Sequence, residues 1–150
     1  MPIEIFSLSS GKSKGDLEHS LNDNIEEKRL RHLFKKATKP MLGIASANEF
    51  KAHRSIGYQN SFLPIAIMCV EPTENGSRLN VKLRMQKYTI GFMVLWLSFT
   101  FFAIVMFALK AEGLVALAPI GMFCFGYILM QTCFWYEVPK IKSILQGIVQ

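Results

Sequence analysis

Charged residues and histidine are missing from two long stretches of the sequence, residues 88–109 and 114–136. Proton relays and charged substrate pathways are built from such residues, so their absence argues against a transporter and against an intramembrane protease. The three histidines, His19, His32 and His53, are far apart and form no metal-ligand spacing. No glycine-rich phosphate loop occurs either. The sequence therefore predicts a protein that is not an enzyme and that binds neither a metal nor a cofactor.

Cysteine is also scarce. Cys69, Cys124 and Cys133 are odd in number and contain no C-x-x-C pair, so no disulfide framework is expected. The N-terminus lacks a basic segment followed by an apolar run, so we expect no cleavable signal peptide. The net charge is +6, but no basic stripe is interleaved with aromatic residues, and we expect no nucleic-acid partner. Basic residues beside apolar stretches instead indicate membrane lipids as partners.

The main feature that is present is the pair of uncharged stretches, which are joined by the four residues 110–113. The first has 22 residues, about 33 Å as a helix, against a hydrocarbon core of about 30 Å. We therefore predict a transmembrane helical hairpin over residues 88–136, with spans at 88–109 and 114–136. Basic residues flank both outer ends, and the loop carries one Lys and one Glu. The positive-inside rule then predicts a multi-pass inner-membrane protein with both termini in the cytoplasm.

Residues 1–40 are expected to form a flexible leader and a basic amphipathic helix. The leader is small and polar around residues 7–15, and the helix runs from about Asp16 to Ala37 before Pro40. Two interpretations of this helix stay open. It packs on the neighbouring domain as a half-buried helix, or it lies in the membrane interface with its lysines at the headgroups.

Residues 41–87 change to a period of two and predict a cytoplasmic antiparallel β-meander. Four strands can be drawn, at 41–45, 49–56, 62–70 and 78–85, and Asn75-Gly76 gives the strongest hairpin signal between them. After Pro139, residues 137–150 predict a C-terminal amphipathic helix that packs near the meander or lies in the interface. The predicted fold class is therefore a membrane α+β protein: a meander of about four strands, a transmembrane hairpin and a C-terminal amphipathic helix.

One phrase in the meander resembles a family pattern. The matching residues are Phe50, Lys51, Arg54, Ile56, Tyr58, Asn60, Ser61, Phe62, Leu63 and Pro64. They resemble the phrase F-K-x-x-R-x-I-x-Y-R-N-S-F-L-P of an uncharacterised family of small bacterial two-span membrane proteins, with Gln59 where the family has Arg. The resemblance covers about residues 43–145. It implies the same layout of sheet and spans, and it carries no assigned activity.

Three groups of candidate functional residues follow. Lipid-headgroup contact is expected from Lys82, Arg84, Lys87, Lys140 and Lys142. Arg54, Tyr58 and Asn60 form either a recognition edge for a ligand or partner, or a turn that Asn60 closes through its side chain. Small residues that favour helix packing are Ala118, Gly121 and Gly126, which pack within the hairpin or against a second copy of the chain.

These features favour a non-catalytic, membrane-anchored binding or interaction module whose partner is a protein or lipid. The alternative is a membrane-disrupting effector that oligomerises through the hairpin. That alternative loosely resembles the effectors of bacterial anti-phage signalling, which pair two spans with a small β-barrel. In those effectors the spans come first, whereas here the order is reversed.

Overall fold

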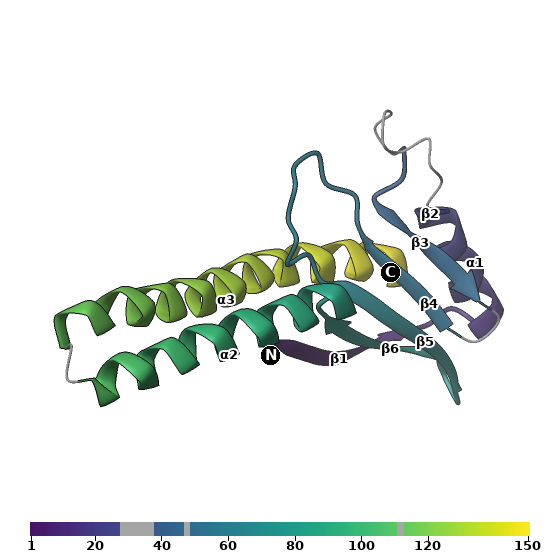
Figure 1. Ribbon diagram of the computed structural model, residues 1–150. Helices are drawn as coiled ribbons and strands as arrows, with labels where there is room; N and C mark the ends of the chain where they lie inside the picture. The colour runs from purple at the N-terminus through teal and green to yellow at the C-terminus, as the bar shows by residue number, and fades with distance from the viewer. Residues whose placement is uncertain (28–37, 47–48, 111–112) are drawn as a thin grey trace.

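The computed structural model describes residues 1–27, 38–46, 49–110 and 113–150 (Figure 1). In this part of the chain, six strands form one sheet in the order β1-β6-β5-β4-β3-β2, and three helices accompany it. All neighbouring strands are antiparallel except β2 and β3, which are parallel. The elements are β1 (Ile3–Ser10), α1 (Lys14–Asn24), β2 (Ile25–Glu27), β3 (Met41–Ser46), β4 (Glu49–Arg54), β5 (Ile65–Thr73), β6 (Gly76–Arg84), α2 (Lys87–Leu109) and α3 (Gly113–Val149).

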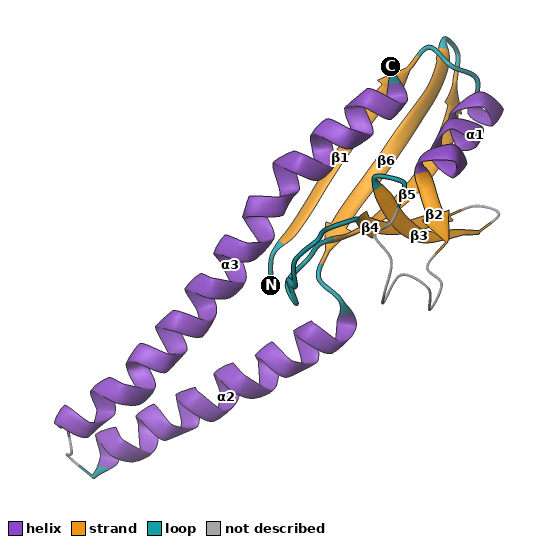
Figure 2. Cartoon of the chain, turned by 90° about the horizontal axis from the view of Figure 1, so that it is seen from above, coloured by secondary structure: helices purple, strands orange, loops and turns teal. Residues whose placement is uncertain are grey.

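One face of the sheet carries the core of the domain, which we call the head. On β6 the alternation predicted from the sequence is present: Leu79, Val81 and Leu83 are buried, and the residues between them point to the other face. The buried face is covered by α1 and by the last turns of α3, which lie on the same side of the sheet (Figure 2). Leu17 of α1 and Leu145 of α3 are both fully buried there. The head core therefore combines both ends of the chain.

The sheet has two more strands than the predicted meander of four antiparallel strands. The four expected strands are present as β3 to β6, but β1 and β2 add one strand at each edge. The region expected to be a flexible leader contains β1, and every residue of β1 pairs with a residue of β6. This pairing joins residues from 67 to 81 positions apart, and local periodicity carries no information about it.

The helix expected from Asp16 to Ala37 begins near its predicted start but ends much earlier. The side chain of Ser13 caps α1 by accepting a hydrogen bond from the Asp16 amide at 3.3 Å. The helix ends at Asn24, and residues 25–27 form β2 beside β3. The rest of the predicted helix, residues 28–37, lies outside the described residues. Where it is described, the helix packs on the sheet.

The β5–β6 hairpin is longer and tighter than expected. Only Glu74 and Asn75 lie between the strands, whereas the sequence predicted strands that end at residue 70 and resume at residue 78. Proline has no backbone N–H to donate to a neighbouring strand. Pro72 is tolerated inside β5 because β4 pairs with β5 only as far as Met68, so no strand on that side requires this hydrogen bond. Gly76 has a φ of +136°, and a Cβ there would lie 2.2 Å from a β1 carbonyl oxygen. Only glycine fits this position.

The two long apolar helices, α2 and α3, lie side by side and extend away from the head (Figure 1). Both are long and apolar enough to cross a membrane, judged by length and composition alone. The predicted separate helix over residues 137–150 is instead the last part of α3, which runs through Pro119 and Pro139 without a break. A proline inside a helix removes one backbone hydrogen bond. Burial of Val138, Ile141 and Leu145 against the head stabilises the helix beyond Pro139.

Candidate functional site

A cluster of charged and polar side chains lies where the head meets the apolar helices. Glu137 of α3 is fully buried, and Arg54 at the end of β4 donates to its Oε2 from Nε at 2.8 Å. Arg54 Nη2 also lies 2.8 Å from Oε2 and 3.0 Å from the Tyr58 hydroxyl. That hydroxyl donates to Glu137 Oε1. Lys140, one turn further along α3, places Nζ 3.5 Å from the same oxygen. We call Arg54, Tyr58, Glu137 and Lys140 the base cluster.

The electrostatics of the base cluster fix its protonation. Burial raises the pKa of Glu137, but the hydrogen bonds from Tyr58 and Arg54 and the nearby positive charges outweigh it, and the net pKa lies below the ordinary 4.5. The hydrogen bond to Glu137 raises the pKa of Tyr58 above 10.0. At neutral pH the carboxylate is therefore charged and the phenol neutral. Both carboxylate oxygens accept hydrogen bonds, so the base cluster connects α3 to the end of β4 and to the loop after it.

The three residues of the predicted recognition edge have different surroundings. Arg54 and Tyr58 meet in the base cluster. Asn60 does not join them, because its Oδ1 accepts the Phe62 amide at 2.9 Å and its carbonyl accepts the Leu63 amide at 3.2 Å. Asn60 therefore closes a turn.

Sequence reasoning missed Glu137, which connects the other members of the base cluster. Its signal was its position: it is the first charged residue after 24 uncharged ones. It also stands on the same helical face as Ile141 and the rest of the buried stripe of α3. A carboxylate within an apolar stripe needs a partner from elsewhere in the chain.

The predicted headgroup contacts divide into two groups. Lys142 pairs with Glu4, and Lys140 pairs with Glu137 and stands 3.4 Å above the Tyr136 ring, so both are engaged inside the protein. In contrast, Lys82, Arg84 and Lys87 have no ion-pair partner within the part of the chain that the structure describes. Lys82 and Lys87 are exposed, and Arg84 is half-buried.

The small residues of α3 also differ. A Cβ at Gly126 would lie 2.9 Å from Nε1 of Trp96 on α2, so this glycine permits close packing inside the helical pair. A Cβ at Gly121 would meet nothing within 4 Å, and Ala118 is exposed. Gly126 therefore belongs to the α2–α3 contact, whereas Ala118 and Gly121 face outward.

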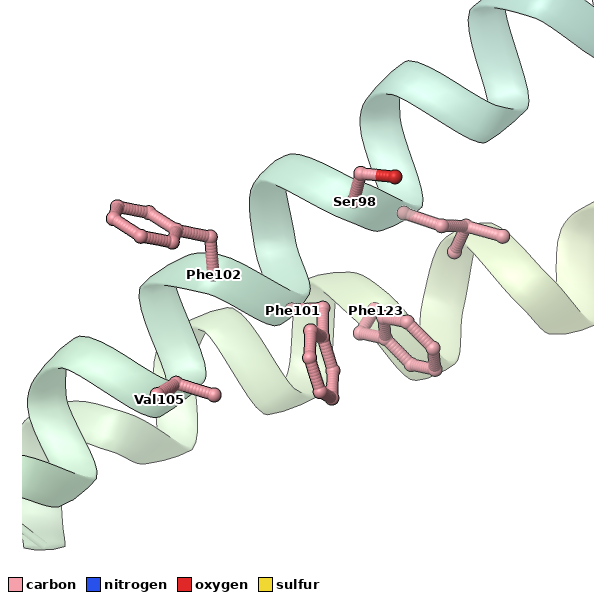
Figure 3. Close-up of a pocket in the computed structure, with 6 residues that line it drawn as sticks. Ser98, Phe101, Phe102, Val105 and Phe123 are labelled. Carbon is pink, nitrogen blue, oxygen red and sulfur yellow. The ribbon is translucent and has the colours of Figure 1, made fainter.

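The surface of the helical pair also has an apolar groove of about 590 Å³ (Figure 3). Phe101 and Val105 of α2 line it together with Phe123 of α3, and Ser98 is its one hydroxyl side chain. Neither an acid nor a base lines the groove. Its lining is apolar apart from the Ser98 hydroxyl.

The chain matches no protein-family model, no curated protein and no solved structure. The resemblance of residues 43–145 to the uncharacterised two-span family therefore stays a prediction. Among the described residues, no group of three or more His, Cys, Asp or Glu side chains is arranged to hold a metal ion.

Proposed function

We propose that this chain is a non-catalytic interaction module in which α2 and α3 anchor the head to the inner membrane, with both termini in the cytoplasm. The observation that supports this most strongly is the exposure of large apolar side chains along both helices. Five phenylalanines are between 59% and 67% exposed, namely Phe92, Phe99, Phe101, Phe102 and Phe125. A surface of this kind is unstable in water and is covered by lipid in a bilayer.

The connections between head and anchor support a fixed geometry at the membrane surface. Only Met85 and Gln86 separate β6 from α2, and α3 enters the head without a break. The loop between β4 and β5 is held to both helices, through Thr89 Oγ1, which donates to the Ser61 carbonyl at 2.8 Å, and through the base cluster. A head held in this way keeps one orientation relative to the bilayer.

Anionic headgroups are the first partner that we assign to the module. Lys87 begins α2 and is the cation that we assign to the headgroups, whereas Arg84 and Lys82 lie further from α2 along β6. Each unpaired cation at the surface of an anionic membrane contributes roughly 1 kcal/mol of attraction. Lys140 and Lys142 contribute less, because carboxylates inside the protein already neutralise them.

The test uses the full chain, because the end of α3 supplies part of the head core. The protein is inserted into nanodiscs of neutral lipid or of neutral lipid mixed with anionic lipid, and lysines are acylated with a water-soluble reagent. Lys87 should react more slowly in the anionic discs, whereas Lys14 on α1 should react equally in both. Equal reactivity of Lys87 would contradict the headgroup contact. Extraction of the chain from membranes by alkaline carbonate would contradict the anchor itself.

The alternative function, an oligomerising membrane-disrupting effector, is favoured by one observation, the outward position of Ala118 and Gly121. Small residues on an exposed helical face allow close approach of a second helix. Overexpression should then arrest growth, and Gly121→Leu should relieve the arrest without disturbing the packing around Gly126. Harmless expression of a stable monomer would contradict this function.

A further inference from the structure

The face of the sheet opposite α1 and α3 is not covered by any element that the structure describes (Figure 1). On this face, the residues that pair across β1, β6 and β5 form rows. In two successive rows, a cation of β6 lies between two isoleucines. Arg84 lies between Ile3 and Ile65, and Lys82 lies between Ile5 and Ile67. We call these six residues the open-face patch.

The open-face patch contains exposed apolar side chains and cations that lack ion-pair partners in the described part of the chain. Ile5 is 70% exposed and Ile3 is 49% exposed, so the apolar flanks of the patch remain in contact with water. The two cations between them have no ion-pair partner in the described part of the chain. Such a combination of aliphatic side chains and unpaired charges is typical of interaction surfaces.

The patch is also hollowed. The next level of the face holds the small or polar residues Ser7, Asn80 and Cys69. Together with Ile5, Ile67 and Lys82 they border a hollow of about 500 Å³. A side chain of a partner could enter this hollow beside the cation.

Charge decides between the candidate occupants. A second copy placed face to face would bring Lys82 and Arg84 against like charges between apolar side chains, which is unfavourable. The bilayer is a poor fit because β1 and β6 run in nearly the same direction as α3 (Figure 2), so the face stands on edge to the membrane. Lys82 also lies two residues, about 7 Å, further from α2 than Arg84. A protein segment that carries carboxylates among aliphatic side chains complements both features of the patch.

We propose that the open-face patch docks an acidic, amphipathic segment of a partner protein at the membrane surface. Aliphatic side chains of the segment pack on the four isoleucines, and its carboxylates pair with Lys82 and Arg84. This inference rests on the proposed function and names the partner of the interaction module.

The experiment uses the full chain in nanodiscs of neutral lipid and a fluorescent synthetic peptide of 18 residues. The peptide forms an amphipathic helix with leucines on one face and glutamates beside them, and a twin peptide has lysine in place of each glutamate. We expect the acidic peptide to bind more tightly than its twin, and its affinity to fall as salt rises. Lys82→Glu with Arg84→Glu should weaken the acidic peptide at least tenfold and should strengthen binding of the basic twin.

The apolar half of the patch has its own variants. Ile5→Thr with Ile67→Thr should weaken the acidic peptide several-fold, because threonine keeps strand propensity but removes apolar contact. A matched control, Lys14→Glu on α1, lies on the covered side of the sheet and should leave the affinity unchanged. An unchanged unfolding temperature shows that each variant is folded.

Three results would overturn the proposal. Equal binding of the two peptides would remove the role of the cations. If the charge-reversed variant lost the slower acylation of Lys87 in anionic nanodiscs and bound the peptide as before, the patch would be assigned to lipid. Concentration-dependent dimerisation that Ile5→Thr abolishes would assign it to a second copy. None of these depends on carbonate extraction, so failure of the anchor and failure of the docking surface are distinguishable.

Discussion

The buried carboxylate of Glu137 explains why Arg54 and Tyr58 stand where they do. Removing a carboxylate from water is costly unless hydrogen bonds and opposite charge replace its hydration. Arg54 and Tyr58 saturate both oxygens, and they come from the end of β4 and from the loop after it. The base cluster therefore fixes the position of this loop relative to α3.

Removing the charge of Glu137 should destabilise the protein strongly. Glu137→Gln leaves Arg54 partly buried without its counter-ion, and we expect a loss of about 3 kcal/mol or more in the free energy of unfolding. Thermal or denaturant unfolding in detergent micelles measures this loss. The control is Glu49→Gln, which removes the exposed pair with Lys51 and should cost less than about 1 kcal/mol.

A double variant distinguishes the cost of leaving one charge buried without a partner from the contribution of the ion pair itself. Arg54→Met together with Glu137→Met replaces both charges by apolar side chains and should recover much of the stability that Glu137→Gln loses. A double variant that is less stable than Glu137→Gln would contradict this account.

The base cluster also predicts how stability depends on pH. The folded pKa of Glu137 lies below its ordinary 4.5, so its contribution is complete above about pH 4.5 and is lost as the pH falls through the folded pKa. The folded pKa of Tyr58 lies above 10.0, so its contribution is complete below that pH and is lost as the pH rises through the folded pKa. Unfolding temperatures measured from pH 3 to pH 11 should therefore fall at both ends.

Two variants test which residue causes the loss of stability at each end of the pH profile. Glu137→Gln should flatten the acid side, and Tyr58→Phe should flatten the alkaline side. An acid limb with the same slope in Glu137→Gln and in the natural chain would show that other carboxylates cause the loss.

At the scale of elements, prediction from the sequence succeeded where the pattern is local. The strict alternation of residues 78–85 identified β6, and the uncharged runs identified α2 and most of α3. It failed for β1, because strand pairing across 70 residues leaves little trace in eight residues of which three are serine. It failed for the end of α1, because tertiary pairing with β3 overrides helix propensity at residues 25–27.

The contact between α2 and α3 depends on one glycine. Gly126→Ala places a methyl group 2.9 Å from Trp96 Nε1, so the indole has to move, and we expect a cost of about 1–3 kcal/mol. Gly121→Ala meets nothing within 4 Å and should be neutral or slightly stabilising, because alanine favours a helix. Unfolding temperature in micelles measures both. Trp96→Phe should rescue Gly126→Ala in part, and a larger cost at Gly121 than at Gly126 would contradict the packing.

At the scale of the whole molecule, the two ends of the chain close the same domain. The Ser10 hydroxyl donates to the Val149 carbonyl at 2.7 Å, and Lys12 Nζ donates to the Ile148 carbonyl at 2.9 Å. These bonds lie at the end of the sheet farthest from α2. Because β1 and the end of α3 belong to one core, we expect both ends of the chain to lie on the same side of a membrane that the hairpin crosses.

This closure makes the membrane topology testable with thiol labelling. In a background of Cys124→Ala and Cys133→Ala, the exposed Cys69 of β5 reports the position of the head. Lys110→Cys in a second background without Cys69 reports the end of α2. In cells with a permeable outer membrane and an intact inner membrane, an impermeant maleimide should label position 110 at once. Cys69 should be labelled only after the inner membrane is permeabilised, because the basic flanks predict a cytoplasmic head. Labelling of both thiols in intact cells would show that the helical pair does not span the membrane, and the reverse order would place the head outside.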